Sequence, residues 1–243
     1  AAMSPDGQLL VSGSDSGTIT VYEAPGGKVI RQVKVLPLPG YQYRSVSTNA
    51  VAVDPQGHRF IAAFSDGQVR AYRRDGTEID GDAGAGGAEI TALFFHPHGE
   101  IIAGTSRGEV RTIFPTAEHP VWAVRVFAGL IRTLALHPSG SPLFIGGAQG
   151  LRAMDWPSGS LMDLPMSKLT TPVSALAVSP DGRLLVAARE QGGFLFWRAG
   201  WQEWFAAACD RLRQHELFTT LAKPGVTVDS ASTLIDVEPY RAY

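Results

Sequence analysis

A short motif with proline at its second position and glycine at its fourth recurs five times along this chain. The copies are SPDG at 4–7, DPQG at 54–57, HPHG at 96–99, HPSG at 137–140 and SPDG at 179–182. Successive glycines are 50, 42, 41 and 42 positions apart, a spacing typical of repeats that each form a four-stranded sheet. Proline presets φ at the second position of a turn, and glycine accepts the positive φ that other residues avoid. The motif therefore predicts one tight turn per repeat.

The segments around each turn alternate apolar and polar residues, which indicates strands with one buried face. Examples are NAVAV and IRTLAL before a turn and HRFIAAFS and GRLLVAA after one. A polar, glycine-containing turn and a third strand follow. The register residue near the end of the third strand, 14 or 15 positions after the turn glycine, is Tyr22, Tyr72, Ile113, Met154 or Trp197. A looser fourth segment such as KVIRQVKVL ends most units. We therefore expect about five four-stranded antiparallel sheets.

At these residues the chain resembles the WD-repeat β-propeller family over roughly residues 1–200. The resemblance implies an all-β propeller whose units are expected near residues 1–36, 37–82, 83–122, 123–165 and 166–200. The opening Gly-His pair and the Trp-Asp pair of the family are missing from their usual places. Apolar packing is therefore expected to hold the blades together.

Five recognisable units are fewer than the seven with which this family usually closes. Three readings stay open: the chain is the C-terminal part of a longer propeller, it closes with five blades, or the 33–50 segment and the 219–243 tail contain degenerate strands. The first reading is favoured, because the first unit lacks most of its first strand.

The segment after residue 200 differs from the repeats. Trp201, Trp204 and Phe205, with Ala208 and Leu212, follow helical spacing, and Pro224 lies beyond them. We expect an amphipathic C-terminal helix over 201–218, packed on the final blades, and an extended tail over 219–243. This stretch is similar to the tails that follow WD repeats in large bacterial signalling proteins.

Side chains that could carry chemistry are present but do not form a recognisable catalytic set. His96, His98 and His137 occupy turn positions, and a metal site would need further ligands that converge on them. Cys209 has no base at a suitable spacing. The sequence therefore predicts no catalytic residue, no cofactor site and no metal site.

Composition limits the classes of partner. The formal net charge is −2 and no basic run is present, so nucleic acid is not an expected partner. No apolar stretch approaches the ~20 residues that span a bilayer, and no leader is seen, so a membrane is not expected either. The single cysteine favours a reducing compartment, and we expect a cytoplasmic protein whose oligomeric state is left open.

The expected function is a non-catalytic scaffold or sensor that binds proteins or other domains of the same chain, within a larger cytoplasmic protein of the bacterial signalling type. Loops and strand ends of a rigid framework carry such contacts, and tyrosine, tryptophan and arginine anchor them. The candidate contact residues are Tyr41, Tyr43, Arg44, Asn49, Glu89, Trp122, Arg132, Trp201 and Trp204. The alternative is a propeller-class hydrolase or lactonase, which predicts three or more acidic or histidine side chains converging in a central channel.

Overall fold

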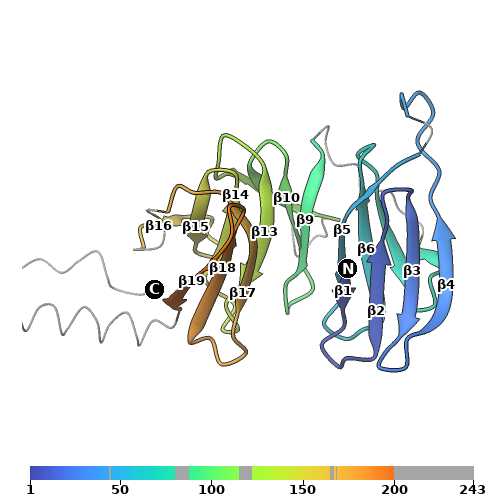
Figure 1. Ribbon diagram of the computed structural model, residues 1–243, viewed down its shortest axis with the longest axis horizontal. Helices are drawn as coiled ribbons and strands as arrows, with labels where there is room; N and C mark the ends of the chain where they lie inside the picture. The colour runs from blue at the N-terminus through green and yellow to red at the C-terminus, as the bar shows by residue number, and fades with distance from the viewer. Residues whose placement is uncertain (44, 80–87, 115–121, 165–166, 168, 200–243) are drawn as a thin grey trace, which may run out of the picture. The chain divides into compact units, whose positions relative to one another are not determined.

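The computed structural model describes residues 1–43, 45–79, 88–114, 122–164, 167 and 169–199 (Figure 1). These residues belong to one compact unit, Ala1–Ala199, and Gly200–Tyr243 form a second. The predicted helix over 201–218 and the predicted tail over 219–243 lie outside the described residues, so both stay predictions.

The described residues of the first unit form five antiparallel sheets that follow one another along the chain. The first contains β1 (Ala2–Met3), β2 (Leu9–Gly13), β3 (Thr18–Glu23) and β4 (Lys28–Lys34). The second contains β5 (Thr48–Val53), β6 (Arg59–Phe64), β7 (Val69–Arg73) and β8 (Glu78–Ile79). The third contains β9 (Ile90–Phe95), β10 (Ile101–Thr105), β11 (Glu109–Ile113) and β12 (Ala123–Arg125). The fourth contains β13 (Ile131–Leu136), β14 (Leu143–Gly147), β15 (Gly150–Met154) and β16 (Leu161–Met162), and the fifth contains β17 (Val173–Val178), β18 (Leu184–Arg189) and β19 (Phe194–Arg198).

This arrangement confirms the predicted all-β fold of consecutive antiparallel blades. Each sheet pairs its strands in chain order, as expected when short turns join neighbouring strands. The third sheet extends past residue 122, the expected end of its unit, because β12 pairs with β11. The fifth sheet has three strands among the described residues.

The repeated tetrapeptide forms the turn between the first two strands of a sheet. In its first copy the amide of Gly7 donates to the carbonyl of Ser4 at 2.9 Å, and Gly7 has a φ of 67°. The Ser4 hydroxyl donates to the carboxylate of Asp6, which also accepts the amide of Gln8 at 3.0 Å. The hydrogen bond from Ser4 holds the pKa of the Asp6 carboxyl below its usual value. The side chains of Ser4 and Asp6 therefore stabilise the turn in addition to its backbone hydrogen bond.

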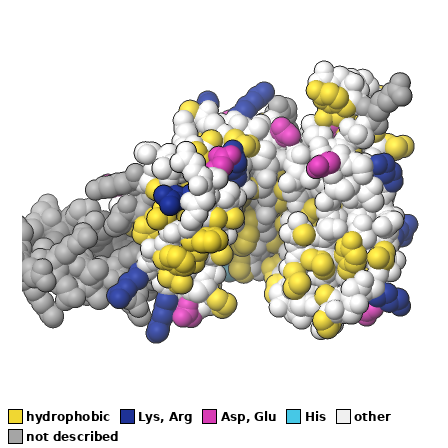
Figure 2. All heavy atoms as spheres, in the orientation of Figure 1, with side chains coloured by type: hydrophobic (Ala, Val, Ile, Leu, Met, Phe, Trp, Pro, Cys, Tyr) yellow, Lys and Arg dark blue, Asp and Glu magenta, His cyan; other side chains and the backbone are white. Residues whose placement is uncertain are grey.

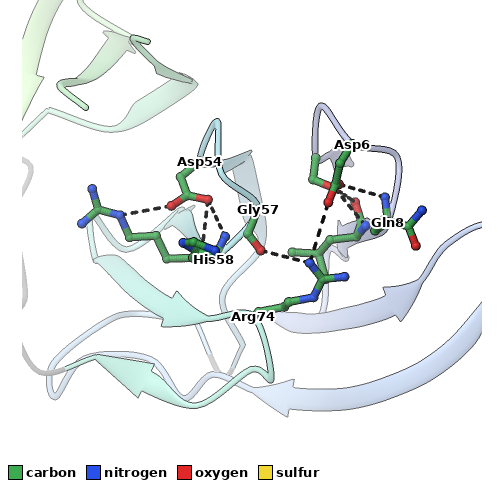
Figure 3. Close-up of polar contacts among 9 residues, drawn as sticks. Asp6, Gln8, Asp54, Gly57, His58 and Arg74 are labelled. Atoms are coloured by element: carbon green, nitrogen blue, oxygen red, sulfur yellow. Dashed lines mark hydrogen bonds and ion pairs between the residues drawn. The ribbon is translucent and has the colours of Figure 1, made fainter. Parts of the chain in front are cut away.

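Turns of neighbouring units contact each other (Figure 3). Arg74 extends its Nη1 toward two turns: it lies 4.0 Å from the carboxylate of Asp6 and donates to the carbonyl of Gly57 at 3.5 Å. Farther along the chain, Nε2 of His137 lies 2.9 Å from the carbonyl of Gly182. The tetrapeptide thus joins strands within a sheet and also links one sheet to the next.

The first strand of each sheet, here called the inner strand, packs against the inner strand of the next sheet. Such contacts run from the first sheet to β5 and on to β9, β13 and β17. The buried clusters between sheets contain aliphatic and aromatic side chains, including Phe60, Phe64 and Tyr72 between the first and second sheets. Among the described residues, no strand of the fifth sheet packs extensively on the first sheet.

Within the described part of the chain, the first and the fifth sheet each have one face without a neighbouring sheet. On the fifth sheet, Phe194 and Phe196 are 65% and 63% exposed. Phe196 lies opposite Val186 on the neighbouring strand, so these two side chains are on the same face of the sheet. On the first sheet, Met3 is 57% exposed. Figure 2 shows hydrophobic side chains gathered over β17–β19 and over the first sheet. These faces have the apolar character of the faces that the middle sheets bury.

Tyr72 provides a test of the packing between the first two sheets. Burial raises the pKa of its hydroxyl from 10.0 to about 12. The folded state therefore holds the phenolic proton more tightly than the unfolded state does. The stability from this difference is complete below pH 10 and is lost between pH 10 and about 12.

We expect the urea midpoint of the protein to fall between pH 10 and 12, and we expect Tyr72→Phe to fall less steeply over the same range. Tyr43→Phe, which changes an exposed tyrosine, should leave the steepness as it is in the unmodified protein. If the urea midpoints of the unmodified protein and of Tyr72→Phe fell equally steeply with pH, Tyr72 would not be the group responsible for the loss of stability.

Candidate functional site

A shallow depression lies where three neighbouring inner strands begin. It has a volume of about 330 Å³ and is lined by Asn49, Glu89, Thr91, Leu130, Ile131 and Arg132. These residues come from the starts of β5, β9 and β13 and the loops just before them. Three of the lining residues, Asn49, Glu89 and Arg132, were predicted as contact residues, so the fold brings together positions up to 83 residues apart in the sequence.

The side chains that line this site are aimed by a repeated irregularity in the strands. In the second to fifth sheets the pairing of the inner strand shifts by one residue near its start, which leaves one residue without a cross-strand partner. The extra residues are Asn49, Thr91, Arg132 and Ser174. Such β-bulges redirect a side chain and are common beside functional sites. We call this end of the inner strands the bulge end.

The bulge residues connect each sheet to the next one. Asn49 donates its Nδ2 to Oε1 of Glu89 at 2.7 Å and to the carbonyl of Ile90 at 3.3 Å. The hydroxyl of Thr91 donates to the carbonyl of Ile131 at 2.5 Å. These bonds fix the strand starts relative to one another, so the depression is preorganised.

Arg132 makes the corresponding connection to the fifth sheet through an ion pair. Its Nη1 lies 3.0 Å from Oε1 of Glu190, which belongs to the turn between β18 and β19. Their side chains are 32% and 46% exposed, so the pair contributes little to stability. Together with Glu89 it places two carboxylates and one guanidinium at the bulge end, all reachable from solvent.

The other predicted contact residues lie in different surroundings. Tyr43 is 60% exposed, and its ring meets that of Tyr41 edge-on at 5.6 Å. Tyr41 is half-buried and donates its hydroxyl to Ser65 at 3.0 Å. Trp122 packs edge-on against Trp156 at 5.0 Å, within the cluster between the third and fourth sheets. The predicted residues Arg44, Trp201 and Trp204 lie outside the described residues.

Sequence reasoning did not identify Thr91, nor the bulge that unites it with Asn49 and Arg132. The position of the bulge residues relative to the turns could have identified them from the sequence. Each bulge residue stands five positions before the first residue of the proline–glycine turn, which is Asp54, His96, His137 or Ser179. The same offset in four units marks one structural position.

A catalytic set of the kind that the alternative function requires would place three or more acidic or histidine side chains together. In the part of the chain that the structure describes, the group that meets this condition is His96, His98 and Glu100. It lies on the turn after β9, at the opposite end of that strand from the depression. Within the described ranges, no helix is long and apolar enough to cross a membrane.

Comparison with known proteins points to one repeat family. The family described as "WD domain, G-beta repeat" matches residues 1–23. Telomerase protein component 1 of Mus musculus is 26% identical over 205 residues, which cover 78% of this chain and 7% of that protein. Target of rapamycin complex subunit wat1 of Schizosaccharomyces pombe is 24% identical over 197 residues, which cover 78% of this chain and 59% of that protein. The chain thus spans less than two thirds of the length of either relative.

Proposed function

Because the chain belongs to the WD-repeat β-propeller family, we propose that it is a non-catalytic protein-interaction scaffold that binds its partner at the bulge end. The observation that carries the proposal is the depression formed by Asn49, Glu89 and Arg132, whose side chains come from consecutive sheets and are held in place by bonds between those sheets. A rigid framework that presents fixed polar groups at one end suits recognition of another protein.

The chemistry of the depression indicates what the partner presents. Glu89 and Arg132 are the charged residues that line the depression, but Arg132 is paired with Glu190 beside it, whereas Glu89 accepts from the neutral amide of Asn49, so Glu89 can attract a basic group. Leu130 and Ile131 supply an apolar floor beside these groups. A partner segment with a lysine or arginine next to an apolar side chain is complementary to this arrangement. Tyr43 is exposed and packs on Tyr41, which bonds to Ser65 beside the start of β5, so an aromatic group is presented at the bulge end of the second sheet.

The relatives support a scaffold role in general terms. The fission yeast relative is named as a subunit of a target of rapamycin complex, and the mouse relative as a protein component of telomerase. Those assemblies are properties of the relatives. The sensor role, the cytoplasmic location and the setting within a larger protein of the bacterial signalling type stay predictions for this chain.

The proposal is tested by placing a photo-crosslinking amino acid at one exposed position at a time. We expect crosslinks to a protein partner from position 43 in cells of the source organism and few from position 56, an exposed site in the turn at the opposite end of the second sheet. Glu89→Lys should lower the yield from position 43 at least tenfold, because the reversed charge repels a basic partner.

Glu78→Lys serves as the matched control, since Glu78 is likewise an exposed glutamate bonded to a neighbouring side chain, Arg70 at 3.2 Å, but lies on the edge strand β8. It should leave the crosslinking yield unchanged. Equal yields from positions 43 and 56, or equal effects of the two lysine variants, would refute binding at the bulge end. Hydrolysis of a lactone or ester by the purified chain would instead favour the enzymatic alternative.

A further inference from the structure

The turn between β9 and β10 brings together three side chains that bind metal ions in proteins. Ligand atoms of His96, His98 and Glu100 all lie within 4.8 Å of one another. Nδ1 of His96 is 2.8 Å from Oε2 of Glu100, and the two imidazole rings are 4.9 Å apart at an angle of 76°. We propose that this turn binds one divalent transition metal ion such as Zn²⁺, through one nitrogen of each histidine and a carboxylate oxygen of Glu100.

The backbone of the turn explains why these positions converge. The amide of Gly99 donates to the carbonyl of His96 at 2.9 Å, and the amide of His96 donates to the carbonyl of Glu100 at 2.8 Å. These bonds close a five-residue segment, so its first, third and fifth side chains leave the same side. In the equivalent turns the first and third side chains also touch, as Ser179 and Asp181 do at 2.5 Å. The turn at 96–100 is the copy with imidazoles at both positions and a carboxylate at the fifth.

The neighbouring turn shows how a histidine at this position is held. His137 has its Nε2 2.9 Å from the carbonyl of Gly182, and its Nδ1 accepts the amide of Ser139 at 3.2 Å. In His96 the amide of His98 points to Nδ1 at 3.3 Å, but the buried Nε2 has no hydrogen-bond partner among the described residues. The ring of His96 is therefore held by fewer hydrogen bonds than that of His137.

Nδ1 of His96 lies only 2.8 Å from a carboxylate oxygen of Glu100. Two acceptors at this distance repel unless a positive charge lies between or beside them. A proton on Nδ1 or a metal ion between the two atoms supplies this charge. His98 adds a further donor within 4.8 Å of both, which a metal ion uses and a proton does not.

The donor set fits zinc and its neighbours. Zn²⁺ takes imidazole nitrogen at ~2.0–2.1 Å and carboxylate oxygen at ~2.0–2.2 Å, and two histidines with one glutamate leave a position for water. Imidazole donors also suit Cu²⁺, Ni²⁺ and Co²⁺. His96 is anchored against Trp156, with ring centroids 5.8 Å apart, whereas His98 is exposed and gives the ion a path from solvent. His137, which the sequence placed beside these two histidines, instead bonds to the next turn, and Glu100 is the third donor.

The test is calorimetric titration of the purified chain with ZnCl₂ after treatment with a chelator. We expect one Zn²⁺ per chain, with an affinity that falls about tenfold or more in His98→Ala and in Glu100→Gln. His58→Ala is the matched control: His58 is an exposed histidine at the fifth position of the preceding turn, and its removal should not change the affinity. Circular dichroism checks that each variant keeps the fold.

A second measurement uses the unmodified protein, so it does not depend on how a variant folds. X-ray absorption at the zinc edge should show a first shell of nitrogen and oxygen with the multiple-scattering pattern of two imidazoles. No saturable binding, an affinity unchanged in both His98→Ala and Glu100→Gln, or a first shell with fewer than two imidazoles would each overturn the proposal. The site is remote from the bulge end, so crosslinking from position 43 should persist in His98→Ala.

Discussion

Gly150→Ala is expected to destabilise the fold by about 3–5 kcal/mol, combining strain at positive φ with overpacking. Gly150 starts β15 with a φ of 106°, and a Cβ built on it would lie 1.8 Å from the carbonyl oxygen of Leu169. That oxygen belongs to the backbone and accepts the amide of Leu151 at 3.3 Å, so it cannot simply move aside. The substitution therefore separates β15 from the segment that leads to the fifth sheet.

Gly67→Ala separates the two contributions. Gly67 occupies the equivalent polar turn of the second sheet with a φ of 85°, but a Cβ there would meet nothing within 4 Å. Its substitution should cost only the backbone strain, about 1–2 kcal/mol. Urea unfolding of both variants gives the difference, with equal m-values as the sign that the unfolded states are comparable. Equal losses of stability would mean that the segment around Leu169 yields easily.

The repeated turns made the fold predictable from the sequence. Proline and glycine at a fixed period, with Tyr22, Tyr72 and Trp197 at a fixed offset, define strands and their order because local turn chemistry determines which strands are neighbours. The structure adds what the period alone does not contain. The contact between Arg74, Asp6 and Gly57 depends on how the first and second sheets pack against each other.

The candidate site was predicted in part, and the reasons differ from residue to residue. Asn49, Glu89 and Arg132 stand just before or at strand starts, and strands that run in parallel begin at the same end. Trp122 was predicted as a contact residue, yet its ring packs on Trp156, because large aromatic side chains serve interfaces and cores equally well. The bulge at Thr91 has no compositional mark and appears only once strand pairing is known.

The grouping of Glu100 with two histidines was missed for a related reason. Glu100 directly follows the turn tetrapeptide and reads from the sequence as the first residue of the next strand. Among the histidines alone, the next possible donor is His137, which is 39 residues away from His98. The turn instead folds back so that its first and fifth residues meet, a contact that depends on backbone hydrogen bonds rather than on residue type.

Two phenylalanine substitutions should show how much more a buried sheet face contributes to the stability of the fold than an exposed one. Phe60 is fully buried between the first and second sheets and stacks on Tyr72, with centroids 5.0 Å apart and planes at 15°. Phe60→Ala should cost about 3–5 kcal/mol, because it removes a large apolar group and leaves a cavity. Phe196 is 63% exposed on the free face of the fifth sheet, and Phe196→Ala should change the stability of the isolated chain by less than about 0.5 kcal/mol.

The same face should affect association rather than folding. Phe194 and Phe196 lie on a sheet face whose counterparts in the middle sheets are covered, and exposed apolar patches promote contact between molecules. The purified chain should therefore self-associate with rising concentration, and Phe196→Glu should weaken this association while the thermal midpoint stays within a few degrees of that of the unmodified chain. Sedimentation velocity over a concentration series measures the effect. A chain that stays monomeric at high concentration, or a Phe196→Glu variant that unfolds, would show that this face is covered by the chain itself.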